Sequence, residues 1–237
     1  MSANKRNIIV KSGLAPVHCF DLWGPIVDSD LLGKISIERY RVLAKSLGKI
    51  PENIEKAVSD YVDLMHGEPW ATGEKKSGII DALEGPLNEA GLSPSYADGF
   101  QEDGLYVLRE ILDAGEGVII LSSKEAPKLR TALPEDIGSR LGTIYGKNKS
   151  KPESFKEVYD AEQALKRMLV THTADELPEL VAARKSGLFQ SGALIYINRN
   201  DSNSEAAVRE EGIDKYINDL KNVGYTHLLE NKIYTKI

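Results

Sequence analysis

The strongest constraint on the fold is an alternation, from about residue 103 onward, of short apolar segments with segments of helical periodicity. The apolar segments predict strands at Val118–Leu121, Thr143–Tyr145, Met168–Thr171 and Ala193–Ile197. The periodic segments predict helices over Leu105–Ala114, Ala126–Leu133, Phe155–Arg167 and Leu177–Lys185. Short buried strands joined by helices are typical of an α/β fold, a doubly wound parallel sheet with right-handed crossovers and helices on both faces.

One further strand is predicted upstream, in the segment LAPVHCFDLWGPIVD, where an apolar run precedes a Gly-Pro turn. The residues after it contain no convincing strand, and their apolar positions indicate helices over Leu31–Leu47, Pro51–Gly67 and Lys75–Ala90. We therefore expect a Rossmann-like α/β core domain, residues 1–28 and 100–237, with an inserted helical domain, residues 29–99. The tail, His227–Ile237, fits either a late strand or an arm.

Composition narrows the classes of protein. The chain has 237 residues and a single cysteine, Cys19, which excludes a disulfide scaffold and fits a reducing compartment. A net charge of -6 argues against general binding of nucleic acid, which needs a concentrated basic face. No apolar run approaches the ~20 residues of a membrane span, and the start, MSANKRNIIVKSG, is not a secretory signal. We expect a soluble cytoplasmic protein that binds neither nucleic acid nor membrane.

Polar residues that suit chemistry come after the predicted strands in chain order. They are Asp21, Ser122 with Ser123, Lys149 between Lys147 and Lys151, and Asp175 with Glu179. Each alone has an ordinary structural explanation, such as a helix cap, an acidic first turn or a solvated loop. Because working groups gather at the carboxyl ends of parallel strands, the set together favours a site for a divalent cation and a phosphate beside a carboxylate nucleophile.

The same segments resemble a known family. FDLWGPIVDSD, GVIILSSKEAPKLRTAL, KSKPESF and ADELPELVAARKSG are similar, in this order, to the four signatures of the haloacid dehalogenase-like (HAD) superfamily. The inserted helical domain resembles the family's cap of the first kind. The resemblance extends to about Arg199.

The resemblance implies a Mg²⁺-dependent hydrolase of a small phosphorylated metabolite. Asp21 would be the nucleophile that forms an aspartyl phosphate, Ser122 would bind the transferring phosphoryl group, and Lys149 would offset negative charge. Mg²⁺ would be bound by the Asp21 carboxylate, the Trp23 backbone carbonyl and Asp175, with Glu179 in direct or water-mediated support. Substrate contacts are expected from Ser123 and Trp23, and from Glu68 and Trp70 in the cap loop.

Trp23 is the main departure from the family's pattern. The family's phosphatases carry an Asp there, which protonates the leaving alcohol and later activates water, and an indole cannot exchange a proton near neutral pH. Losing a general acid/base typically costs on the order of 10² to 10⁴ in rate. Pro25 in place of Thr and Ala174 in place of Gly depart further. A catalytically silent phosphometabolite-binding protein and dehalogenase- or phosphonatase-type chemistry are therefore the alternatives.

One histidine stands near the predicted site. His172 precedes Asp175 and is placed either to replace the missing acid/base or to pack as a satisfied strand-end histidine.

Overall fold

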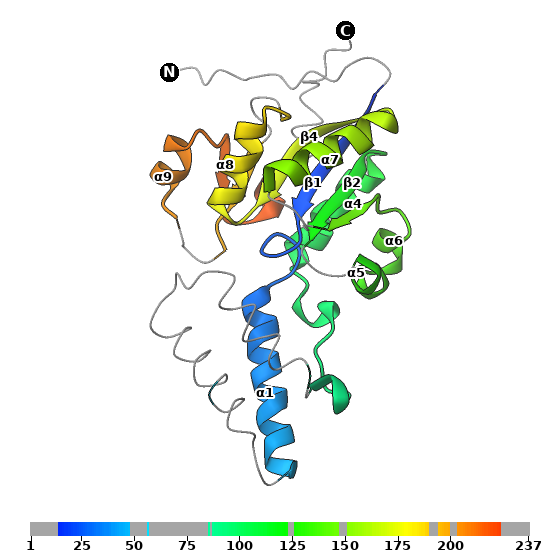
Figure 1. Ribbon diagram of the computed structural model, residues 1–237, viewed down its shortest axis with the longest axis vertical. Coiled ribbons are helices and arrows are strands. Elements are labelled where there is room, and N and C mark those ends of the chain that lie inside the picture. Colours follow the sequence, from blue (N-terminus) through cyan, green and yellow to red (C-terminus); the bar gives the residue numbers. More distant parts are fainter. Residues whose placement is uncertain are drawn as a thin grey trace. The chain divides into compact units, whose positions relative to one another are not determined.

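The computed structural model describes residues 14–47, 56, 85, 87–122, 126–146, 151–189, 194–199 and 203–223 (Figure 1). These residues include a sheet of six parallel strands in the order β3-β2-β1-β4-β5-β6. The strands are β1 (Ala15–Asp21), β2 (Gly117–Ser122), β3 (Ile144–Gly146), β4 (Arg167–Ala174), β5 (Leu194–Ile197) and β6 (Lys215–Ile217). The chain builds outward from β1 in both directions, so the doubly wound parallel α/β fold predicted from the sequence is confirmed.

Helices cover both faces of this sheet. The helices of the sheet domain are α4 (Glu102–Asp113), α5 (Ala126–Ala132), α6 (Glu135–Gly138), α7 (Lys151–Ala164), α8 (Leu177–Ser186) and α9 (Glu205–Glu210). Helices α7 and α8 lie side by side over one face of the sheet (Figure 1). Val17 and Cys19 of β1 lie in one core cluster with Phe155 of α7 and Leu180 of α8. Because side chains alternate along a strand, Phe20 points to the opposite face. Helix α4, which has a row of buried residues along one side, contacts β2.

The chain divides into two compact units, one formed by Met1–Val27 and Phe100–Ile237 and the other by Asp28–Gly99. In the second unit, helix α1 (Ser29–Leu47) begins where the Asp28 carboxylate accepts the Leu31 N–H, at 2.9 Å. The short 3-10 helix η1 (Tyr96–Gly99) ends this unit, and a second one, η2 (Leu220–Val223), belongs to the sheet domain. The role of the Asp28–Gly99 unit as a cap stays a prediction.

Several boundaries differ from the sequence expectation. The helix predicted over Phe155–Arg167 ends at Ala164, and Arg167 instead begins β4. Strand β4 also continues past the predicted Thr171 to Ala174. The short elements α6, α9 and β6 were not predicted. The helices expected at Pro51–Gly67 and over most of Lys75–Ala90, and the tail from His227, lie outside the described residues.

The second half of β4 is buried, although three of its four residues are polar. Thr171, His172 and Thr173 are each 0% exposed. The Thr171 hydroxyl pairs with Nδ1 of His18 on β1, at 2.8 Å, and the other nitrogen of His18 lies 2.7 Å from the Glu116 carboxylate. Partners of this kind offset the cost of burying polar groups, so the strand runs on and delivers its last residue to the edge of the sheet.

Within the described residues, no helix combines the length and the apolar character needed to cross a membrane.

Candidate functional site

The carboxyl ends of the central strands bring the first candidate residues together. Asp21 ends β1, Ser122 ends the neighbouring β2, and Asp175 comes directly after β4 on the other side of β1. The strands β2 and β3 are added on one side of β1, and β4, β5 and β6 on the other. The strand order therefore reverses between β1 and β4, which makes this position a topological switch point. In open parallel sheets, ligands bind in the crevice at such a point.

Asp21 has the geometry of a fixed carboxylate. Its residue is 2% exposed, and its Oδ1 accepts the backbone N–H of Leu22 at 2.9 Å. Ser122, 1% exposed, ends the adjacent strand one position beyond Leu121, which is the register partner of Asp21. A buried carboxylate held by a backbone donor at a strand end is suited to act as a nucleophile in one orientation.

Asp175 has a carboxylate oxygen that the described residues leave without a donor. Its Oδ1 is buried and has no hydrogen-bond partner among them. Burial raises the pKa of Asp175 well above its ordinary value, and the nearby charges of Asp21, Glu176 and Glu179 raise that pKa further. A buried oxygen without a donor, beside a second carboxylate, is a chemical fit to a divalent cation with oxygen ligands.

A tight loop after β1 carries the third metal ligand implied by the resemblance, the backbone carbonyl of Trp23. The loop closes on itself, because Gly24 N–H donates to the Val27 carbonyl and Val27 N–H donates to the Leu22 carbonyl, both at 2.9 Å. Gly24 has φ +79°, and a Cβ built on it would overlap Cγ of Asp175. Only glycine allows this loop to lie so close to Asp175.

Trp23 itself is half-exposed, whereas Leu22, Pro25 and Ile26 around it in the loop are buried. The indole is therefore not simply a core side chain. It supplies an N–H donor and an apolar face, but no group that exchanges a proton near neutral pH.

Glu179 and His172 form a buried pair beneath helix α8. Both residues are 0% exposed, and His172 Nε2 lies 3.1 Å from Glu179 Oε1. The His172 ring packs edge-on against Phe155, with ring centroids 5.0 Å apart, and near Phe189. His172 is therefore packed between aromatic rings and paired with Glu179, while its Nδ1 has no hydrogen-bond partner among the described residues. Its service as a replacement acid/base stays a prediction. Glu179 as a magnesium ligand stays a prediction.

The metal site would therefore depend on few side chains. In the described part of the chain, no three His, Cys, Asp or Glu side chains form a group able to hold a metal ion. Asp21, Asp175 and the carbonyl of Trp23 stay the oxygen donors that the resemblance implies. Ser123, Lys149, Glu68 and Trp70 lie outside the described residues, so their predicted roles stay predictions.

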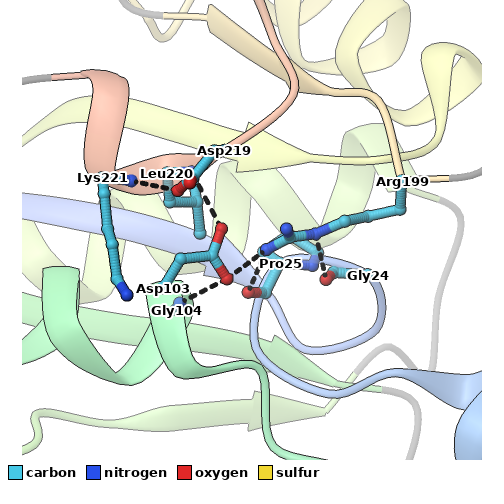
Figure 2. A network of polar contacts seen from close by, with 8 residues as sticks. All are labelled: Gly24, Pro25, Asp103, Gly104, Arg199, Asp219, Leu220 and Lys221. Carbon is cyan, nitrogen blue, oxygen red and sulfur yellow. Dashed lines mark hydrogen bonds and ion pairs between the residues drawn. The ribbon is translucent and has the colours of Figure 1, made fainter.

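An arginine that binds the loop was not predicted. Arg199, two residues after the end of β5, donates from Nε to the Gly24 carbonyl at 3.1 Å and from Nη2 to the Pro25 carbonyl at 3.3 Å (Figure 2). Its Nη2 also pairs with Asp103 of α4 at 2.8 Å. The signal that could have identified Arg199 is its place just beyond the fifth predicted strand, equivalent to the places of Asp21, Ser122 and Asp175.

Solved structures of haloacid dehalogenase-like hydrolases share the fold of this chain. No family model matches the sequence, and no curated protein matches it. A haloacid dehalogenase-like family hydrolase from Streptococcus pneumoniae aligns over 90% of this chain and 97% of its own, at 15% identity and a TM-score of 0.53.

Two further structures hold ions. A HAD family hydrolase from Deinococcus radiodurans R1, with bound phosphate and sodium, aligns over 95% of this chain and 100% of its own, at 16% identity and a TM-score of 0.54. The protein YfnB from Bacillus subtilis, bound to magnesium, aligns over 90% of this chain and 98% of its own, at 11% identity and a TM-score of 0.54. At these identities the likeness shows the fold, which is the fold that the sequence signatures imply.

Proposed function

We propose that this protein is a Mg²⁺-dependent hydrolase that acts on a small phosphorylated metabolite through covalent phosphorylation of Asp21. The observation that carries the proposal is the buried Oδ1 of Asp175, which has no hydrogen-bond partner among the described residues and lies beside the Asp21 carboxylate at the switch point of the sheet. A cation would stabilise two neighbouring carboxylates with buried oxygens, and it would also attract a phosphate. The bound ions of the structural neighbours support the same chemistry.

In the proposed reaction, an oxygen of Asp21 forms a bond to phosphorus while the bond from phosphorus to the substrate's alcohol oxygen breaks. Ser122 donates a hydrogen bond to the transferring group, and Lys149 offsets its charge. When bound, Mg²⁺ would supply further positive charge against the phosphoryl oxygens. Water then attacks the phosphorus of the aspartyl phosphate, which releases inorganic phosphate and restores the Asp21 carboxylate.

Trp23 shapes this proposed cycle. The leaving alcohol takes its proton from solvent rather than from residue 23, so substrates with good leaving groups are favoured. The second step lacks a base at this position, so the phosphorylated enzyme should persist. Glu68 and Trp70 in the inserted unit, with Ser123, are proposed to choose the substrate.

The proposed setting is the cytoplasm, because the chain has a single cysteine, Cys19, which is buried in β1.

The test is turnover of a panel of activated aryl phosphates and small phosphate esters, measured with Mg²⁺ and with a chelator. We expect Mg²⁺-dependent phosphate release that Asp21→Asn abolishes, because the amide is a poor nucleophile of the same shape. No turnover on any ester, or an Asp21→Asn variant as active as the parent, would refute the proposal.

A catalytically silent protein that binds phosphorylated metabolites is the second candidate. It is favoured by the presence of Trp23 where an acid/base would act and by the burial of His172. Calorimetric titration separates the two functions: the silent protein binds a phosphorylated metabolite tightly and forms no product, whereas the hydrolase consumes it.

A further inference from the structure

Arg199, which follows β5, joins the loop after β1 to helix α4. The guanidinium contacts the carbonyls of Gly24 and Pro25, at 3.1 and 3.3 Å, and Asp103 at 2.8 Å (Figure 2). The Arg199 and Asp103 side chains are only 14% and 10% exposed. A guanidinium presents several N–H donors in one plane, so a single side chain can bond a carboxylate and two carbonyls at once.

Asp103 is itself held from other directions. Its Oδ1 accepts the Gly104 N–H and its Oδ2 accepts the Leu220 N–H, both at 2.9 Å (Figure 2). Burial alone would raise the pKa of Asp103, but the hydrogen bond and charge of Arg199 and the backbone donors outweigh burial and lower that pKa. Asp103 is therefore an ionised anchor that fixes the position of Arg199.

The loop is also confined on both sides. A Cβ built on Gly104 of α4 would overlap the Pro25 carbonyl oxygen, so α4 lies directly against the loop. A Cβ built on Gly24 would clash with Asp175, so the Asp175 carboxylate lies against the loop as well. The carbonyls that Arg199 binds belong to the residues directly after Trp23.

We propose that Arg199 is a positioning residue that, held by Asp103, fixes the loop of residues 22–27 and with it the backbone carbonyl and the indole of Trp23. This inference rests on the proposed function, in which the Trp23 carbonyl is a ligand of Mg²⁺. Removing partners that orient a metal ligand typically lowers metal affinity or activity by about 10- to 100-fold. A purely structural ion pair between Arg199 and Asp103 would stabilise the fold without governing the loop.

Trp23 offers a direct readout of the loop. The chain has two tryptophans, so Trp70→Phe leaves Trp23 as the only indole emitter. In that background, acrylamide quenching of the metal-free protein reports how closely the loop is held. A titration with Mg²⁺ alone, followed by the same emission, reports metal affinity.

The informative variant is Arg199→Lys, which keeps the charge beside Asp103 but loses the planar fork that reaches both carbonyls. We expect stronger quenching of Trp23 and a Mg²⁺ dissociation constant raised by about 10- to 100-fold. Arg199→Met, which removes both the charge and the fork, should move quenching and affinity further. If Arg199→Met does not fold, Arg199→Lys alone decides.

A matched control comes from Arg130 of α5, which also binds backbone carbonyls, those of Gly138, Leu141 and Gly142 at 2.8, 3.1 and 2.6 Å. Arg130→Lys removes the same kind of contact elsewhere in the domain and should leave Trp23 quenching and Mg²⁺ affinity unchanged. Unchanged quenching in Arg199→Lys, or an equal change in Arg130→Lys, would overturn the inference. Stronger quenching in Arg199→Lys with no Mg²⁺ binding in any variant, the parent included, would support the positioning role and refute the proposed metal site.

Discussion

Gly24 is the residue on which the geometry of the loop depends most. Its φ of +79° is strained for any L side chain, and its Cβ would overlap the Asp175 carboxylate carbon. Gly24→Ala should therefore lower the free energy of unfolding by about 1–2 kcal/mol because of the left-handed backbone. Overpacking against Asp175 should lower it by roughly a further 1–3 kcal/mol. Urea unfolding followed by circular dichroism measures the loss.

Gly115 supplies the control, because it has φ +77° and a built Cβ there would meet nothing within 4 Å. Gly115→Ala should show only the backbone cost, about 1–2 kcal/mol. Equal losses in the two variants would mean that Asp175 does not lie against the loop.

Trp23 is the residue that separates this chain from phosphatases with an acid/base at the same position. Trp23→Asp restores a proton carrier and keeps the backbone carbonyl of residue 23. We expect it to raise Mg²⁺-dependent phosphatase turnover by up to about 10²-fold, the low end of general acid/base contributions. Steady-state turnover of one aryl phosphate, with folding checked by thermal melting, measures the gain.

Trp23→Asn is the matched comparison. Asn has the shape of Asp and leaves the same void, but it has no titratable group. It should show none of the gain. A folded Trp23→Asp variant no faster than Trp23→Asn would show that more than the acid/base is missing. Pro25 would then be the next residue to test.

At the scale of elements, strands were predictable where burial coincided with an apolar sequence. Strand β4 runs past its apolar part because Thr171 and His172 find buried partners across the sheet and beneath α8, which no local pattern reveals. The edge strand β6 was missed because Lys215, Tyr216 and Ile217 are all partly exposed and form no apolar run. Side-chain partners distant in sequence decided the first case, and exposure at the sheet edge decided the second.

Helix α4 is tied to the loop by a pair that depends on pH. The lowered pKa of Asp103 means that the folded state holds this proton less tightly than the unfolded chain does. The stability it contributes is present above the ordinary value of 3.8 and is lost as pH falls through the lower, folded pKa. Asp103→Asn should therefore cost most near about pH 6, and the difference from the parent should shrink below about pH 3.

Urea unfolding at both pH values checks this prediction. Asp136→Asn is the control, because Asp136 also pairs with an arginine, Arg109 at 2.6 Å, but at an exposed position. Exposed ion pairs contribute little, so its difference should be small at both pH values. A loss in Asp103→Asn that is as large in acid as near neutrality would contradict the account.

At the scale of the whole molecule, topology made the placement of the candidate residues predictable. Asp21 and Asp175 were expected at one edge of the sheet because the carboxyl ends of parallel strands lie there, whatever the details of packing, and their roles stay predictions. The pairing of Arg199 with Asp103 could not, because it joins positions 96 residues apart that no periodicity or motif connects. Contacts that support the loop are therefore set by tertiary structure.

The charge balance of the molecule predicts how it responds to metal. The Asp175 carboxylate has a buried oxygen and lies beside other carboxylates, so Asp175→Asn should raise the melting temperature in the presence of a chelator by removing that repulsion. Saturating Mg²⁺ should stabilise the parent, by about 2.7 kcal/mol at one hundred times the dissociation constant, and should not stabilise Asp175→Asn.

Thermal melting with and without Mg²⁺ makes the comparison, and Glu176→Gln, at an exposed neighbouring position, is the control that should keep the Mg²⁺ response. An Asp175→Asn variant that melts below the parent in chelator, or that gains as much from Mg²⁺, would count against a metal site at Asp175.

The most direct test of the central claim is the intact mass of the protein after incubation with an aryl phosphate and Mg²⁺. Because Trp23 cannot activate water, the parent should accumulate one phosphoryl group, and peptide mapping should place it on Asp21. The Asp21→Asn variant should stay unmodified, and Trp23→Asp should carry less of the adduct because its second step is faster. A parent that binds the ester without gaining mass, or an adduct of the same size in Asp21→Asn, would contradict nucleophilic catalysis by Asp21.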